Sequence, residues 1–262
     1  MLTELMGKRA RWWLIGAAAL LFLSVAARFV SRRFVFPTHE VARSESPSGF
    51  VEHVLAAEDG VLVHALELPS PPGGRTVVYF HNNRETAESR ASLARELHAR
   101  GVGVLLVEYR GYGRSAGDPS EDGLYRDAEA ALDMLARRGV GAQRIVLWGT
   151  SLGTGVAAEM ARRGRGASLV LETPYTSIPD LVRDAVPLVP ASLLIADHFD
   201  TLSKAREIRV PTLVIHGDAD EIVPFWMGEH IVQNLPHARM VRIPAGRHGD
   251  LFARQRERLL DA

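Results

Sequence analysis

The stretch Ile145-Val-Leu-Trp-Gly-Thr-Ser-Leu-Gly-Thr-Gly155 places a serine between an apolar strand and a predicted helix, Leu152–Arg163. It contains the pattern Gly149-x-Ser151-x-Gly153. Such a turn holds the serine in a strained backbone conformation, so that its hydroxyl projects above the sheet. Side chains two positions away would collide with the strand and the helix, and glycine is therefore needed there. We predict Ser151 to be a nucleophile; the alternative is a serine that only caps the helix.

The segments on either side of this stretch alternate between strand and helix patterns. Predicted strands are Thr76–Phe80, Val102–Tyr109, Ser168–Glu172, Thr212–His216 and Arg239–Ile243; predicted helices are Glu88–Arg100, Leu124–Arg138 and the tail Asp250–Leu260. Two earlier apolar runs, Phe50–Ala57 and Val61–Leu68, flank Asp59-Gly60, which is typical of a hairpin. The sequence therefore predicts an α/β fold with a mostly parallel sheet, helices on both faces and an antiparallel start.

One connection between predicted strands is long and runs from about Thr173 to Arg209. It is too short for a large lid domain, and we expect a small cap or a few short helices over the site. Within it, the apolar segment Leu181–Ile195 either lines an acyl pocket or belongs to the ordinary core.

The composition excludes several classes of function. The chain has 262 residues with 31 basic and 31 acidic side chains, so it lacks the basic excess of nucleic-acid-binding proteins. It has no cysteine, which excludes disulfides, thiolate metal sites and a cysteine nucleophile. A length of this order suits one domain with a sizeable core. The composition does not indicate an oligomeric state.

The N-terminus carries an uncharged apolar run, Trp12–Ala27, followed by Arg28, Phe29 and Val30. Because a bilayer core needs about 20 apolar residues in a helix, we predict a transmembrane anchor over residues 1–31. A cleaved signal peptide and a buried helix are the alternatives, the former because Lys8, Arg9 and Arg11 precede the run.

Three regions follow from this assignment: an anchor over residues 1–31, a linker over 32–49 and a globular domain over 50–262. Basic residues flank the apolar run on both sides, so the positive-inside rule is close to a tie. A short N-terminal tail ahead of a single span is typical of an export signal. We therefore expect a single-pass membrane protein whose globular domain lies outside the cytoplasm.

A serine hydroxyl is a weak nucleophile without a base, and the base needs a carboxylate to orient it. When such a serine follows a strand of an α/β sheet, the chain order is serine, acid, histidine. Asp218 and Asp220 both follow the predicted strand Thr212–His216. We favour Asp220 because the turn after Gly217 would aim it at the base, and we expect Asp218 to bond the local backbone.

Ten histidines are available as the base. His248 lies in Ala245-Gly-Arg-His-Gly249, a glycine-flanked loop after the last predicted strand. Such a loop can carry the ring over the carboxyl edge of the sheet, and we predict His248 to be the general base. His81 and His216 stand at strand ends, where we expect structural or oxyanion-loop roles.

Acyl transfer also needs hydrogen-bond donors for the developing oxyanion. The N–H of Leu152, the residue after the nucleophile, is one expected donor. The second is expected from the loop after Thr76–Phe80, which begins His81-Asn82-Asn83. We favour the N–H of Asn83, with Asn82 as the alternative; a loop that is merely polar is also possible.

Jointly, these and further motifs resemble the membrane-anchored branch of α/β-hydrolase-domain (ABHD-type) proteins, over about residues 12 to 252. The motifs are Phe34-Val-Phe-Pro37, Glu108-Tyr-Arg-Gly-Tyr-Gly-Arg-Ser115 leading to Pro119-Ser-Glu121 and the helix with Asp127, Gly149-Thr-Ser-Leu-Gly-Thr-Gly155, Glu172-Thr-Pro-Tyr-Thr-Ser177, and His216-Gly-x-x-Asp220. One departure is His81-Asn82-Asn83, where relatives usually carry His-Gly-Asn.

The resemblance implies the α/β-hydrolase fold, a Ser151–Asp220–His248 triad, and hydrolysis of esters or thioesters of lipids or acylated molecules. It implies neither a metal nor an organic cofactor. The expected partners are an acyl substrate and, through the N-terminal helix, a membrane. A serine peptidase or aminopeptidase on the same fold is one alternative function. A catalytically inactive, membrane-bound binding protein is another.

Overall fold

The computed structural model describes residues 31–41 and 46–251. Its eight strands are β1 (Val51–Ala56), β2 (Leu62–Leu68), β3 (Thr76–Phe80), β4 (Gly103–Val107), β5 (Ile145–Thr150), β6 (Ser168–Glu172), β7 (Thr212–Gly217) and β8 (Ala238–Ile243). The helices are α2 (Ala91–Ala99), α3 (Glu121–Arg137), α4 (Leu152–Arg162), α5 (Ile178–Ala185), α6 (Ala191–Leu194), α7 (Thr201–Ala205) and α8 (Phe225–Asn234), with short 3₁₀ turns at Thr38–Glu40, Ala87–Arg90 and Ala142–Arg144.

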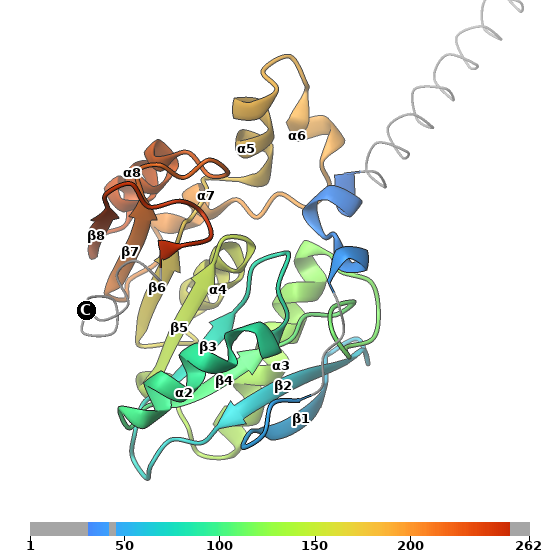
Figure 1. The fold of residues 1–262 in the computed structure, drawn as a ribbon, viewed down its shortest axis with the longest axis vertical. Helices are drawn as coiled ribbons and strands as arrows, with labels where there is room; N and C mark the ends of the chain where they lie inside the picture. The colour runs from blue at the N-terminus through green and yellow to red at the C-terminus, as the bar shows by residue number, and fades with distance from the viewer. Residues whose placement is uncertain (1–30, 42–45, 252–262) are drawn as a thin grey trace, which may run out of the picture.

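The strands form one sheet in the order β1-β2-β4-β3-β5-β6-β7-β8 (Figure 1). Strands β1 and β2 are antiparallel to each other, and β2 is antiparallel to β4. Strands β4, β3, β5, β6, β7 and β8 all run parallel to one another. The predicted hairpin and the mostly parallel sheet are therefore confirmed. Because parallel strands share one carboxyl edge, the loops that follow β3, β5, β7 and β8 are brought to the same side of the molecule.

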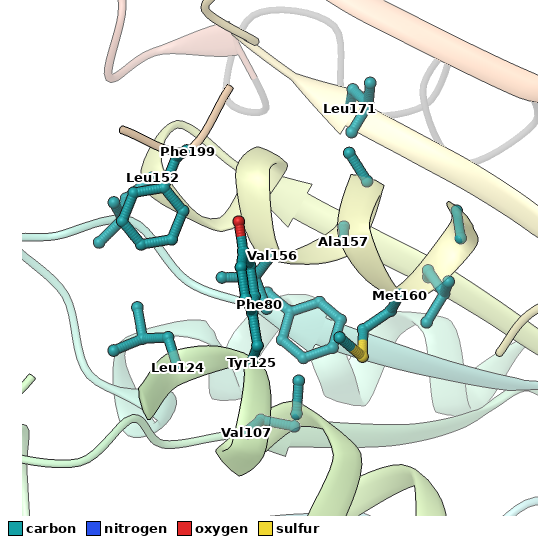
Figure 2. Close-up of a cluster of buried hydrophobic side chains, with 14 of the residues drawn as sticks. Phe80, Val107, Leu124, Tyr125, Leu152, Val156, Ala157, Met160, Leu171 and Phe199 are labelled. Atoms are coloured by element: carbon teal, nitrogen blue, oxygen red, sulfur yellow. The ribbon is translucent and has the colours of Figure 1, made fainter. Parts of the chain in front are cut away.

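Alternation along the strands divides the core into two layers. Val78 and Phe80 of β3 face the layer that contains α3, α4 and α8, while Val77 and Tyr79 face the layer that contains α2. Figure 2 shows side chains of α4, among them Val156 and Met160, close to Phe80 and Tyr125. Both faces of the central strands are thus covered, as their nearly continuous apolar sequences require.

The long connection after β6 folds into α5, α6 and α7, as expected. Ser177 begins α5 as a side-chain cap that accepts a hydrogen bond from the N–H of Asp180 (3.1 Å). Helices α5 and α6 project from the carboxyl edge of the sheet (Figure 1). This is the small cap that the length of the connection predicts.

Residues 31–35 are helical, and part of the predicted linker packs against the domain. Val35 and Phe36 are buried in the main core, and Phe36 lies edge-on to Phe199. The predicted anchor, apart from residue 31, lies outside the described residues, as does the predicted C-terminal helix beyond Leu251. Over 31–41 and 46–251, no helix is long and apolar enough to cross a bilayer.

Candidate active site

Ser151 occupies a sharp turn between β5 and α4. Its φ of 50° and ψ of −115° lie outside the regions that most side chains adopt. The flanking glycines make the turn possible, because a Cβ at Gly149 would collide with the carbonyl of Gly153 and a Cβ at Gly153 with that of Phe80. The strained serine predicted from sequence is therefore present, at the N-terminus of a helix.

Three side chains from distant parts of the chain meet above this turn. The Nε2 atom of His248 lies 3.1 Å from the Oγ of Ser151, and its Nδ1 atom lies 2.9 Å from Oδ2 of Asp220. Because an ionised carboxylate only accepts, Nδ1 carries a proton that it donates to Asp220. In this tautomer, Nε2 of His248 presents a lone pair to which the Ser151 hydroxyl donates. We call these residues the Ser151–His248–Asp220 cluster.

The side chain of Asp220 is fully buried but is well supplied with donors. The backbone N–H groups of Ile222 and Val223 donate to its Oδ1 at 2.9 and 2.8 Å. Burial alone would raise its pKa, but hydrogen bonds from His216 and His248 and the charge of His248 outweigh that effect and hold the pKa well below the usual range. Asp220 therefore stays ionised across the physiological pH range.

His216, at the end of β7, is a second support for Asp220 that sequence reasoning assigned only a general structural role. Its Nε2 lies 3.0 Å from the carbonyl oxygen of Val223, an acceptor, so this nitrogen carries the proton. The same nitrogen lies 3.5 Å from Oδ2 of Asp220. This contact could have been predicted from the spacing His216-x-x-x-Asp220 at the end of a buried strand.

Asp218 differs from Asp220 in its surroundings. It accepts from the N–H of Ala245 (2.6 Å) and pairs with Arg242 (2.9 Å), and these contacts lower its pKa. Asp218 therefore joins the loop after β7 to the loop that carries His248, and does not contact the imidazole. We expected Asp218 to bond the local backbone. It does bond the backbone, but that of a loop 27 residues further along the chain.

The loop after β3 is held from two sides. Nδ1 of His81 lies 2.6 Å from the carbonyl of Asn82, and Nε2 of the same buried ring lies 2.9 Å from Glu108. The side-chain amide of Asn83 donates to the carbonyl of Val35 (2.9 Å), and the hydroxyl of Tyr112 donates to the carbonyl of Asn83 (3.2 Å). The conformation of residues 82 and 83 is thereby fixed.

A cavity of about 350 Å³ opens beside Ser151. Its polar end is formed by Ser151, His248, Leu152 and the loop 82–84. Its remaining walls are apolar and come from three segments: Phe34 and Val35, Tyr175 with the α5 residues Ile178, Leu181 and Val182, and Ile222. Two larger hollows, of about 600 and 540 Å³, lie away from the cluster, on the sheet beside α2 and beside the N-terminal segment.

Sequence reasoning missed two walls of this cavity. Phe34 and Val35 fell within the predicted linker, and Tyr175 was noted only as part of a motif. The aromatic and apolar pattern of Phe34-Val-Phe-Pro37 was the available indication, since a solvated linker seldom carries such residues in succession. Within the described residues, no group of His, Asp or Glu side chains is arranged to hold a metal ion.

The chain shares this architecture with known proteins. Residues 72–201 match the family model described as serine aminopeptidase, S33. An uncharacterized protein of Mycobacterium tuberculosis is 34% identical over 254 residues, covering 93% of this chain and 90% of the relative. The alpha/beta hydrolase domain-containing protein WAV2 of Arabidopsis thaliana is 31% identical over 222 residues, covering 76% of this chain and 72% of the relative.

Solved structures agree at the level of the fold. An esterase of Pyrococcus furiosus superposes with a TM-score of 0.70 at 16% identity, covering 84% of this chain and 94% of the esterase. The esterase RhEst1 of Rhodococcus superposes with a TM-score of 0.64 at 19% identity, covering 80% and 96%. From its sequence relatives, its sheet topology and these superpositions, the chain belongs to the α/β-hydrolase family.

Proposed function

We propose that this protein is a serine hydrolase that cleaves carboxylic esters or thioesters with an apolar acyl group, and that it is tethered to a membrane by its N-terminal segment. The observation that carries the proposal is the continuous hydrogen-bonded chain from the Oγ of Ser151 through His248 to Asp220. A buried carboxylate that stays ionised, an imidazole held in one tautomer and a strained serine together form a Ser–His–Asp triad.

In the first step, the Oγ of Ser151 attacks the acyl carbonyl carbon while Nε2 of His248 takes the hydroxyl proton. The imidazolium that forms is stabilised by Asp220. The tetrahedral intermediate collapses, the bond to the leaving group breaks, and His248 gives its proton to that group. Water then attacks the acyl-enzyme with His248 again as base, which releases the acid and regenerates the serine.

For the oxyanion we propose the N–H groups of Leu152 and Asn83. Leu152 is the first residue of α4, so its N–H has no intrahelical acceptor. In a trans peptide the carbonyl of Asn82 and the N–H of Asn83 point in opposite directions. His81 holds that carbonyl from the protein interior, which leaves the N–H of Asn83 free to face the cavity that both residues line.

The lining of the cavity favours esters and thioesters over the peptidase alternative. An aminopeptidase must bind a free ammonium group, which calls for a carboxylate near the nucleophile. The described walls of the cavity carry no carboxylate; Arg84, Tyr175 and His248 are their ionisable side chains. The apolar walls instead suit a short or medium acyl chain. Amide hydrolysis stays the second candidate because the matching family model is described as an aminopeptidase.

The test is labelling by a fluorophosphonate probe, followed by rates on p-nitrophenyl esters of increasing chain length and on aminoacyl amides. We expect labelling of the wild-type protein and of Ser92→Ala, an exposed serine on α2, and none of Ser151→Ala. Ester rates should exceed amide rates and should peak at an intermediate chain length. Labelling of Ser151→Ala at the wild-type rate would refute the assignment, and faster cleavage of aminoacyl amides would favour the peptidase.

A further inference from the structure

An exposed apolar surface lies on the cap beside the cavity. Residues 185–196 (Ala-Val-Pro-Leu-Val-Pro-Ala-Ser-Leu-Leu-Ile-Ala) contain no charged side chain, yet most of them are exposed. Leu188 is 97% exposed, Leu193 69% and Phe34, from the N-terminal segment, 78%. We call residues 185–196 together with Phe34 the apolar tip. Large apolar side chains gathered on one surface of a soluble domain mark an interaction site.

The described N-terminal segment is hydrogen-bonded to the C-terminal end of residues 185–196 and to Asp197, which follows them. The hydroxyl of Ser31 donates to the carbonyl of Leu194 (3.4 Å), and the guanidinium of Arg32 pairs with Asp197 (2.9 Å). Figure 1 shows α5 and α6 projecting from the domain next to this segment. The point at which the chain leaves the domain towards its apolar N-terminal run is therefore fixed beside the tip.

The length of chain between the run and the tip limits how far apart they lie. Ser31 follows Ala27, the last residue of the uncharged run, by four positions. Four residues span at most about 14 Å even when fully extended. The interfacial region of a bilayer is about 5–7 Å thick on each side of the hydrocarbon core. If residues 12–27 cross a bilayer, the tip is thus held at or near its surface.

We propose that the apolar tip docks on the lipid bilayer, so that the cavity beside Ser151 opens towards the membrane. Leu181 and Val182 of α5 line that cavity, and the tip begins three residues after Val182. An ester that resides in the bilayer would reach the serine along an apolar surface without crossing water. This choice of substrate rests on the proposed function, whereas the docking does not require it.

The experiment uses the absence of cysteine from the chain to label single positions. Full-length Leu188→Cys and Val54→Cys carry an environment-sensitive dye and are reconstituted into phosphatidylcholine nanodiscs with or without spin-labelled lipids. Val54 is 58% exposed on β1, away from the cap, and is the matched control. We expect blue-shifted emission and at least twofold quenching by the spin-labelled lipids at position 188, and neither at position 54.

Emission at position 188 that matches the control overturns the proposal. Blue-shifted emission without quenching by the lipids also overturns it, because protein, such as a second copy of the chain, then covers the tip. Neither readout depends on catalysis, so the docking is tested even if the proposed hydrolase activity is absent.

A second variant tests the route of the substrate. In nanodiscs, Leu188→Asp combined with Leu193→Asp should lower hydrolysis of a long-chain ester embedded in the bilayer about tenfold and leave hydrolysis of p-nitrophenyl butyrate unchanged. Val54→Asp should alter neither. Equal loss on both substrates, or no loss on either, would contradict the route. A wild-type protein inert towards p-nitrophenyl butyrate would instead contradict the proposed function.

Discussion

At the scale of single residues, burial separates two aspartates that the sequence places two positions apart. Asp220 is enclosed and hydrogen-bonded to His248, whereas Asp218 is partly exposed and holds the backbone of the neighbouring loop. Their roles in our proposal therefore differ in kind. Asp220 sets the tautomer and charge of the base, and Asp218 helps to place the loop that carries it.

Replacing Asp220 with Asn should lower kcat about 10³- to 10⁴-fold, because an amide in place of the carboxylate neither selects the productive tautomer nor stabilises the imidazolium. KM should change little. Asp218→Asn keeps an oxygen that can accept from Ala245 and should lower kcat less than tenfold. Steady-state kinetics on a p-nitrophenyl ester check both. A larger loss for Asp218→Asn than for Asp220→Asn would reverse our assignment of the acid.

Asn83 also acts at this scale, through its bond to the carbonyl of Val35. Asn83→Ala keeps the proposed oxyanion N–H but loses the bond that orients it, so we expect kcat to fall about tenfold. The control is Asn234→Ala, which removes a similar bond to the carbonyl of His230 and one from Arg206, at a residue that does not line the cavity. Affinity for a trifluoromethyl ketone should fall in parallel with kcat/KM. Unchanged affinity for this inhibitor would contradict a positioning role.

At the scale of elements, helix α4 follows the turn at Ser151 and carries a buried carboxylate, Glu159, within a cluster of ion pairs. Its Glu159 accepts from Arg162 and Arg163, both at 2.8 Å, and lies 3.4 Å from the Nζ of Lys204 on α7. Burial alone would raise the pKa of Glu159, but the hydrogen bonds from Arg162 and Arg163 and the charge of Lys204 lower it to about 2. The cluster joins α4 to the connection that carries the cap.

This shift has a definite sign for stability. The unfolded chain takes up the proton near the ordinary pKa of 4.5 and the folded protein only near 2, so the stabilisation is complete above about pH 5 and is lost as the pH falls to 2. When the pH falls in this way, we expect the free energy of unfolding to decrease by about 2–3 kcal/mol on account of Glu159. Denaturant unfolding at pH 7 and pH 3 should show a smaller loss of stability for Glu159→Gln than for the wild type. An equal loss in both proteins would contradict this account.

At the scale of the whole molecule, one buried arginine joins the antiparallel start to the parallel domain. Arg110, after β4, donates to Asp127 of α3 at 2.8 Å and to Asp59 in the β1–β2 turn at 2.6 Å. Asp127 is fully buried, so its charge depends on this partner. A single guanidinium thus links a hairpin, a strand end and a helix that lie far apart in sequence.

Arg110→Met should destabilise the fold by about 3–5 kcal/mol, because the carboxylate of Asp127 would stay buried without its partner. For a domain of this size, that corresponds to a fall in Tm of roughly 10 °C. Arg126→Met removes only exposed or half-exposed ion pairs and should cost less than about 1 kcal/mol. Thermal melts of the two variants make the comparison. Similar Tm values would show that the buried pair adds no more than the exposed ones.

Local sequence patterns were sufficient to predict much of the secondary structure of this protein. Strand and helix order, the hairpin at Asp59-Gly60 and the elbow at Ser151 follow from periodicity and turn chemistry, which act over a few residues. The turn after Gly217 and the glycine-flanked loop after the last strand then indicated Asp220 and His248, and the resemblance to a known family implied the same two residues. Both contacts follow from topology, because β5, β7 and β8 are parallel and their loops leave at one edge.

Only the tertiary structure decided which distant segments enclose the cavity. The contact of Val35 with Asn83 spans 48 residues, and that of Ser31 with Leu194 spans 163. No local propensity encodes such pairings, since they depend on how the cap and the N-terminal segment pack on the finished sheet. The sequence by itself determined the strands, the helices α2, α3 and α4, and the sharp turn at Ser151. Packing between elements determined the shape of the pocket around that serine and the exposure of the apolar tip.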